Sequence, residues 1–187
     1  MARWEPNAPE RLSKAALELF AERGYENTTV IDIAARAGLT KSTFFRHFQD
    51  KREVLFGGST LAGLLAEAIA SAPAAAGPVE AVICAMDAAG REAFTPERRE
   101  FSAQRRSVIA AHPELQEREA LKGLTITAAM TEALRRRGVP DLTACVVAEL
   151  GGLAMKIGYE RWVEAEAGDF GEAARRALDE VQAAIAR

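Results

Sequence analysis

Residues 38–51, GLTKSTFFRHFQDK, combine side chains that can contact a polyanion with side chains that can anchor a helix. On a helical wheel at 100° per residue, Phe44 and Phe48 share one face with Leu39. The opposite face carries short polar and basic side chains, namely Ser42, Thr43, Arg46 and Gln49. The segment therefore predicts a short helix with an apolar inner face and a hydrogen-bonding outer face.

The outer face has the chemistry that a helix needs in the major groove of DNA. Arg46 can donate to a guanine edge or a phosphate, and the short Ser42 and Thr43 let the helix lie deep in the groove. Thr40, at the helix start, can bind a phosphate together with exposed backbone amides. Phe45, on the flank, can contact a sugar–phosphate edge or a thymine methyl. The basic side chains that would position the DNA backbone are Lys41, His47 and Lys51.

A protein that does not bind DNA can show the same pattern. Helix-turn-helix shapes occur in ordinary helical cores, and one arginine with two lysines on a helix is commonly a solvated face. His47 alone is more often a surface residue than a contact. Geometry by itself leaves both interpretations open.

The rest of the chain predicts an all-α protein, because no stretch alternates with the period of a strand and Ala, Leu, Glu and Arg dominate. Gly24 and Gly38 end the first two helices, a Thr29–Asp32 capping box opens the second, and Thr40 caps the third. About nine helices are expected, at residues 9–23, 30–37, 40–48, 51–71, 79–94, 96–111, 113–138, 141–166 and 170–186.

Residues 16–56 closely resemble the DNA-binding head of the TetR family of bacterial transcriptional regulators. The shared pattern is Phe-x-x-x-Gly-Tyr, Thr-Thr, Ile-Ala-x-x-Ala-Gly, a hydroxyl residue followed by Lys, and a closing Phe-x-x-Lys. The resemblance implies a three-helix DNA-binding domain over residues 1–52 and a larger helical effector-binding and dimerisation domain over 53–187. Helix four, from about residue 51, would connect the two.

The resemblance also assigns operator contacts to specific positions. Phe45 stands where the family usually has tyrosine, so it lacks a hydroxyl that would bond a phosphate. Ser42 stands where glycine is common, and it adds a polar group that could contribute to base choice. The implied DNA-binding residues are Thr29, Thr40, Lys41, Ser42, Thr43, Phe45, Arg46, His47 and Lys51.

The last two expected helices carry apolar stripes, and Gly151 with Gly152 would allow a close backbone approach. The resemblance implies that these helices pair two chains into a homodimer, which would present two recognition helices to a palindromic operator. Alternatively, both stripes face the core of their own domain. The stripe of the first of these helices is Leu142, Val146, Leu150, Leu153, Ile157 and Trp162.

An effector pocket is expected in the C-terminal domain, although each apolar candidate also fits a core position. Residues 101–115 distantly resemble actinobacterial relatives whose effectors are thought to be acyl thioesters, which favours a lipophilic ligand with an anionic end near Arg105 and Arg106. Alternatively, both arginines are solvated or pair with Glu97, Glu100 or Asp87. The candidate pocket residues are Met86, Phe94, Phe101, Arg105, Ile109, Leu124, Met155 and Trp162.

Composition narrows the function classes. The net charge is −3, and residues 1–57 hold nine Lys/Arg against eight Asp/Glu, so non-specific coating of nucleic acid is not expected. Two histidines, no phosphate loop, no nucleophile elbow and no metal-ligand cluster argue against an enzyme, a cofactor or a metal site. The two cysteines are too few for a disulfide framework. Residues 61–86 are interrupted by charges and prolines, so a cytoplasmic protein without a membrane partner is expected.

These observations predict a ligand-responsive transcriptional regulator, with the small-molecule effector releasing a repressor dimer from double-stranded DNA. The alternative is a small-molecule carrier whose helix-turn-helix head does not bind DNA.

Overall fold

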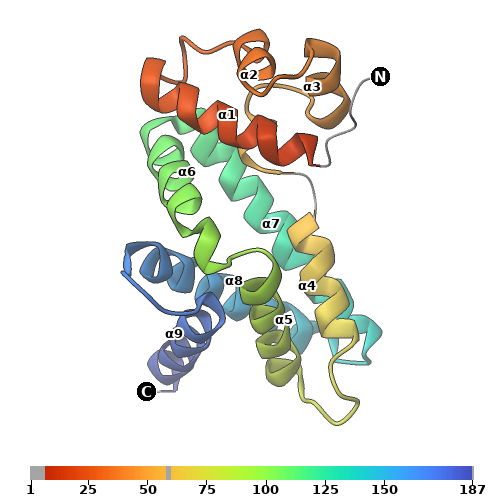
Figure 1. The fold of residues 1–187 in the computed structure, drawn as a ribbon. Helices are drawn as coiled ribbons and strands as arrows, with labels where there is room; N and C mark the ends of the chain where they lie inside the picture. The colour runs from red at the N-terminus through yellow and green to blue at the C-terminus, as the bar shows by residue number, and fades with distance from the viewer. Residues whose placement is uncertain (1–6, 58–59, 187) are drawn as a thin grey trace. The chain divides into compact units, whose positions relative to one another are not determined.

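A computed structural model describes residues 7–57 and 60–186, and within these ranges it contains nine α-helices and two 3-10 helices but no strand (Figure 1). The predicted all-α class is confirmed. The 3-10 helices are η1 (Glu53–Leu55) and η2 (Pro96–Arg98). The α-helices are α1 (Ala8–Arg23), α2 (Val30–Arg36), α3 (Lys41–His47), α4 (Thr60–Ala70), α5 (Pro78–Glu92), α6 (Arg99–Ala111), α7 (Pro113–Arg136), α8 (Asp141–Glu164) and α9 (Phe170–Ile185).

The chain divides into two compact units. Unit 1 contains the described residues up to 57 together with Gln104–Glu119, and unit 2 contains Ser59–Ala103 and the residues from Ala120 onward. Helices α6 and α7 therefore contribute residues to both units. The expected domain boundary between residues 52 and 53 stays a prediction, and it did not anticipate that Gln104–Glu119 groups with the N-terminal helices.

Helix α1 supplies the apolar floor of unit 1 and ends as the sequence predicts. Gly24 has a φ of +82°, and its amide donates to the Phe20 carbonyl at 3.0 Å. The Tyr25 ring then packs edge-on against Phe20, with ring centroids 5.0 Å apart. This contact closes the helix end. The apolar stripe of α1 is buried and consists of Leu12, Ala16, Leu19 and Phe20.

A complete capping box opens α2. The Asp32 amide donates to the Thr29 hydroxyl at 3.2 Å, and the Thr29 amide donates to the Asp32 carboxylate at 2.9 Å. Hydrogen bonds from Thr29 lower the pKa of Asp32 below its ordinary value. Beyond α2, Gly38 takes a φ of +66°, and Arg11 donates to the Ala37 carbonyl at 2.5 Å. The turn between α2 and α3 is therefore stabilised by the left-handed Gly38 and by the hydrogen bond from Arg11.

The expected helix from Lys51 to about Ser71 is replaced in the structure by a different arrangement. Residues 51–57 form turns and the 3-10 helix η1, Gly57 adopts a left-handed φ of +47°, and α4 begins only at Thr60. Asp50 does accept hydrogen bonds from the Arg52 and Glu53 amides. The Glu53 carboxylate binds Arg118. A partner 65 residues away therefore decides this local conformation.

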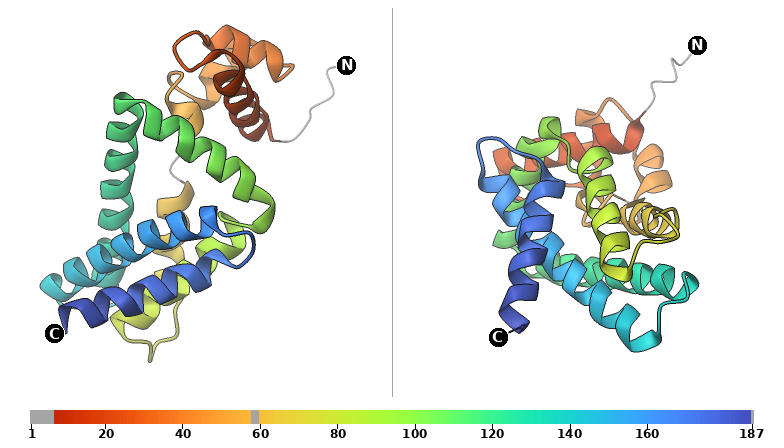
Figure 2. Two further views of the ribbon diagram at one scale, coloured as in Figure 1. Left: turned by 90° about the vertical axis from the view of Figure 1, so that its left-hand side faces the viewer. Right: turned by 90° about the horizontal axis from the view of Figure 1, so that it is seen from below.

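Unit 2 is built around α5, α8 and α9, with α4 against α5. Figure 2 shows α8 and α9 running side by side. A Cβ added at Gly158 would lie 2.6 Å from the Ala174 Cα, so glycine permits the two backbones to approach closely. At Gly151, by contrast, an added Cβ would meet the side chains of Val82 and Met130. Within this chain, the close approach of α8 to α9 is therefore at Gly158.

By length and composition alone, α8 could cross a membrane. Its buried positions pack within unit 2, against α5 and α9, as those of a core helix do. They are mostly small residues, and the buried set is Ala144, Ala148, Gly151, Ala154, Met155, Gly158 and Trp162.

Candidate nucleic-acid interface

Helix α3 has the two faces that its sequence predicts. Phe44 is completely buried and Phe48 nearly so, with their ring centroids 5.6 Å apart. Leu39 is half-buried beside them, whereas Phe45 is exposed. The exposed polar and basic side chains of this segment are Thr40, Lys41, Ser42, Arg46, His47 and Gln49. The two adjacent phenylalanines therefore have separate roles, one in the core and one on the surface.

The start of α3 is held by two threonines. The Thr43 amide donates to the Thr40 hydroxyl at 3.1 Å, and the two hydroxyl oxygens lie 3.0 Å apart. Thr43 is consequently half-buried rather than fully outward as expected. The cap fixes where the outer face begins, and a phosphate contact by Thr40 would have to use the remaining hydrogen-bonding capacity of its hydroxyl.

Three outward side chains have no partner in the part of the chain that the structure describes. Within the described residues, neither Ser42 nor Arg46 nor His47 makes a side-chain hydrogen bond or ion pair. Lys41 differs slightly, since its amine lies 5.8 Å from the Phe45 ring centroid. The outer face of α3 therefore keeps a guanidinium, an imidazole and a hydroxyl available to an external ligand.

Lys51 has a defined position that its sequence did not reveal. Its amine donates to the Tyr25 carbonyl at 2.7 Å and lies 4.0 Å from the centre of the Tyr25 ring. The His112 ring also contacts Tyr25, with centroids 4.9 Å apart. Burial, followed by a hydrogen bond to Glu114, raises the pKa of Tyr25. The expected phosphate contact of Lys51 stays a prediction. It would use the ammonium protons of Lys51 that do not bond the Tyr25 carbonyl.

Arg105, expected in an effector pocket, takes part in a clamp around Phe56. Arg105 pairs with Glu119 at 2.5 Å and donates to the Leu55 carbonyl at 2.6 Å. Its guanidinium carbon lies 5.1 Å from the Phe56 ring centroid, and that of Arg118 lies 5.5 Å away. Glu119 was not among the partners considered from sequence, since a spacing of 14 residues across the break at Pro113 gives no local signal.

The other pocket candidates are distributed over both units. Met86, Met155 and Trp162 belong to the buried core of unit 2, with Phe94 packed against it. Phe101 is half-buried, Ile109 is buried and Leu124 is exposed. The structure does not gather these residues into a single cluster, and their role as a pocket stays a prediction.

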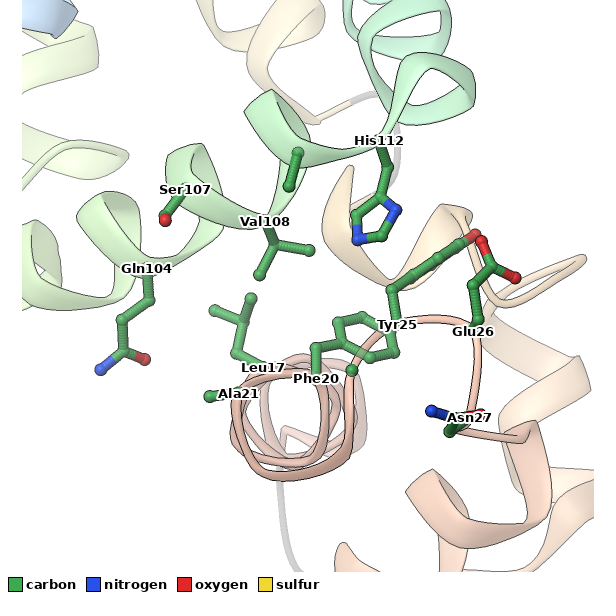
Figure 3. Close-up of a pocket in the computed structure, with 12 residues that line it drawn as sticks. Leu17, Phe20, Ala21, Tyr25, Glu26, Asn27, Gln104, Ser107, Val108 and His112 are labelled. Atoms are coloured by element: carbon green, nitrogen blue, oxygen red, sulfur yellow. The ribbon is translucent and has the colours of Figure 1, made fainter.

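A groove of about 470 Å³ lies within unit 1, between the end of α1 and the C-terminal part of α6. Figure 3 shows Val108 and His112 on one side, facing Leu17, Phe20 and Tyr25 on the other. None of the predicted pocket residues lines it. The remaining lining residues are Ala21, Gly24, Glu26, Asn27, Gln104, Ser107 and Ala111.

Comparison with known proteins identifies the family. Residues 12–56 match the model of bacterial regulatory proteins of the tetR family, and residues 76–186 match a TetR C-terminal model described as the MftR C-terminal domain. The second match covers more than half of the chain. The protein belongs to the TetR family of bacterial regulatory proteins, as its sequence pattern predicts.

Among individual relatives, MftR of Mycobacterium tuberculosis is 29% identical over 200 residues, which cover 100% of this chain and 96% of MftR. TcmR of Streptomyces glaucescens is 51% identical over 45 residues, or 24% of this chain. The matched stretches make up only 20% of TcmR and 16% of YerO from Bacillus subtilis. Similarity to these last two therefore covers only about a quarter of this chain.

Solved structures share the fold. PfmR from Thermus thermophilus is 28% identical with a TM-score of 0.50, and the match covers 91% of this chain and 96% of PfmR. The triclosan complex of SmeT, the repressor of a Stenotrophomonas maltophilia multidrug efflux pump, is 24% identical with a TM-score of 0.62. That match covers 94% of this chain and 90% of the SmeT chain.

Proposed function

We propose that the protein is a ligand-responsive repressor that reads DNA with the outer face of α3. The observation that carries the proposal is that Phe44 and Phe48 fix this helix from inside, while Ser42 and Arg46 face outward without a partner among the described residues. Unpaired donors on a fixed helix are suited to base edges, whose recognition requires a defined helix position. In this proposal residues 1–52 bind DNA and residues 53–187 bind the effector and form the dimer.

The apolar outer surface of α8 supports dimerisation. Leu142, Val146 and Leu153 belong to the apolar stripe that the sequence predicts, and their side chains are 76%, 47% and 45% exposed. Trp162, by contrast, is only 2% exposed, so the stripe divides between the core and the surface. We propose that a second copy covers the exposed part, which would set two α3 helices against the halves of a palindromic site.

The proposed regulation is release by a small molecule. SmeT is the repressor of a multidrug efflux pump, and its complex with triclosan is an example of a protein with this fold that binds a small molecule. An effector of this protein would favour a dimer whose half-site spacing no longer fits the operator, and it can do so only by binding the two states with different affinity. We propose a lipophilic effector, a cytoplasmic location and no catalytic role.

Selection of bound sequences from a random duplex pool tests the proposal. The expected result is enrichment of a palindromic site, with an affinity whose logarithm falls with the logarithm of salt concentration. A panel of small apolar molecules should then release that site from the wild-type protein. A pool without any enriched sequence would instead favour a small-molecule carrier with a head that does not bind DNA.

A further inference from the structure

Two hydrogen-bond donors in the core region of unit 2 lack acceptors. The indole Nε1 of Trp162 and the Nε of Arg99 are both buried, and neither has a partner within the described residues. Trp162 itself is 2% exposed. An unsatisfied buried donor costs about 1–3 kcal/mol, so each of these two groups would gain from an acceptor outside the chain.

The Arg99 guanidinium lies over the Trp162 ring and carries a positive charge. The guanidinium carbon of Arg99 lies 5.2 Å from the Trp162 ring centroid. Its terminal nitrogens donate to the Ala165 and Gly168 carbonyls, which fix the group but do not neutralise it. No carboxylate among the described residues forms an ion pair with Arg99. This local charge favours an anionic acceptor over a neutral one.

Two further aromatic rings lie beside Trp162. Phe94 lies 6.0 Å from Trp162 and 5.4 Å from Tyr159, measured between ring centroids, and both Phe94 and Tyr159 are half-buried. The Tyr159 hydroxyl is already used, since it donates to the Ser102 carbonyl at 3.0 Å. These rings can therefore offer apolar contact, while Arg99 and Trp162 supply the unused polar groups.

We propose that Arg99 and Trp162 bind the carboxylate of an apolar organic acid. One carboxylate oxygen accepts the Arg99 Nε proton, another accepts the Trp162 indole proton, and the apolar part of the acid lies against Phe94 and Tyr159. The proposal rests on the effector-responsive function above and supplies the chemical class of its ligand. It assigns the anionic end to Arg99 instead of Arg105, because Arg105 is paired with Glu119.

The indole proton of Trp162 gives a direct test by ¹H–¹⁵N NMR. The full-length protein is titrated with octanoate, octan-1-ol and octylamine, and Trp162→Phe identifies the signal. Octanoate should move the indole proton downfield, whereas the alcohol and the amine should not, since only the carboxylate is a charged acceptor. An indole signal that no probe moves would overturn the proposal and leave ordered water as the partner of both donors.

Calorimetry on variants separates the two donors. Arg99→Gln and Trp162→Phe should each weaken octanoate binding by about tenfold or more, the loss expected for one hydrogen bond to a charged group. Arg91→Gln removes a charge from an exposed position of the same unit and should change the dissociation constant by less than about twofold. Circular dichroism verifies that each variant is folded. Equal octanoate affinity in all three variants would overturn the assigned site.

Operator binding distinguishes failure of the site from failure of the proposed regulator. If wild-type protein selects no DNA sequence, the regulator is contradicted whatever octanoate does. If it selects an operator but octanoate neither binds nor shifts the indole, only the carboxylate site is contradicted. Octanoate bound at Arg99 and Trp162 with a lowered operator affinity would support both.

Discussion

The outer face of α3 and the clamp around Phe56 use the same residue type in opposite ways. Arg46 is exposed and has no partner among the described residues, whereas the Arg105 side chain is 12% exposed and binds a carboxylate, a carbonyl and a ring. The presence of an arginine therefore does not by itself indicate a ligand site. An arginine whose three nitrogens all bind protein groups, such as Arg105, is part of the structure, and one held without a partner is available for recognition.

The largest expected effect is a difference in stability between variants of the adjacent Phe44 and Phe45. Phe44→Ala should lower the free energy of unfolding by about 3–5 kcal/mol, because it empties a completely buried ring position. Phe45→Ala removes an exposed ring and should cost less than about 1 kcal/mol. Urea denaturation followed by circular dichroism measures both. Similar losses for the two variants would contradict the division of α3 into a core face and a surface face.

The clamp predicts the next largest effect. Arg105→Gln should destabilise the protein by about 1.5–3 kcal/mol, since it breaks an ion pair and a hydrogen bond to the Leu55 carbonyl at a mostly buried side chain. Arg46→Gln should change stability by less than about 0.5 kcal/mol. The same denaturation experiment compares them. Equal stability of the two variants would show that Arg105 contributes no more to stability than the exposed Arg46 does.

Loss of the α2 cap is expected to have a smaller effect. Thr29→Ala should cost about 1 kcal/mol at neutral pH. Because hydrogen bonds from Thr29 lower the pKa of Asp32, their stabilisation is complete above the ordinary aspartate value of about 4 and is lost as pH falls through the lowered pKa. The variant should therefore raise the Asp32 pKa, measured by NMR titration. An unchanged pKa would mean that the Thr29 hydroxyl does not stabilise the carboxylate.

The smallest expected change concerns Phe45. Phe45→Tyr adds a hydroxyl on the exposed flank of α3, where it should bond a phosphate. DNA affinity should increase by less than about tenfold, the worth of one net hydrogen bond, with reduced base selectivity. Fluorescence anisotropy on the selected operator and on a scrambled duplex compares the two affinities. Unchanged or weaker operator binding would argue against a backbone contact at this position.

Local signals explain which features were predictable from sequence. Gly24, Thr29 and Thr40 specify helix ends through their own backbone and neighbouring residues, and the period of Phe44 and Phe48 specifies the inner face of α3. All of these predictions were confirmed. They need no knowledge of the rest of the fold.

Features that depend on distant partners could not be predicted in this way. The segment 51–57 was expected to be helical, but Arg105 and Arg118 bind its carbonyl and carboxylate groups from far along the chain. Likewise, Trp162 is apolar in any periodicity analysis, and only its position beside Arg99 reveals an unpaired indole donor. Side-chain pairing across long sequence separations leaves no periodic pattern.

Arg46→Ala tests whether the outer face of α3 reads base sequence. Affinity of the variant for the selected operator, measured by fluorescence anisotropy, should fall by about 1–3 kcal/mol, with altered preference at the contacted base. Lys51→Ala, as the matched control, should weaken all duplexes alike, because a phosphate contact carries no sequence information. An Arg46→Ala protein with wild-type affinity and base preference would contradict the account.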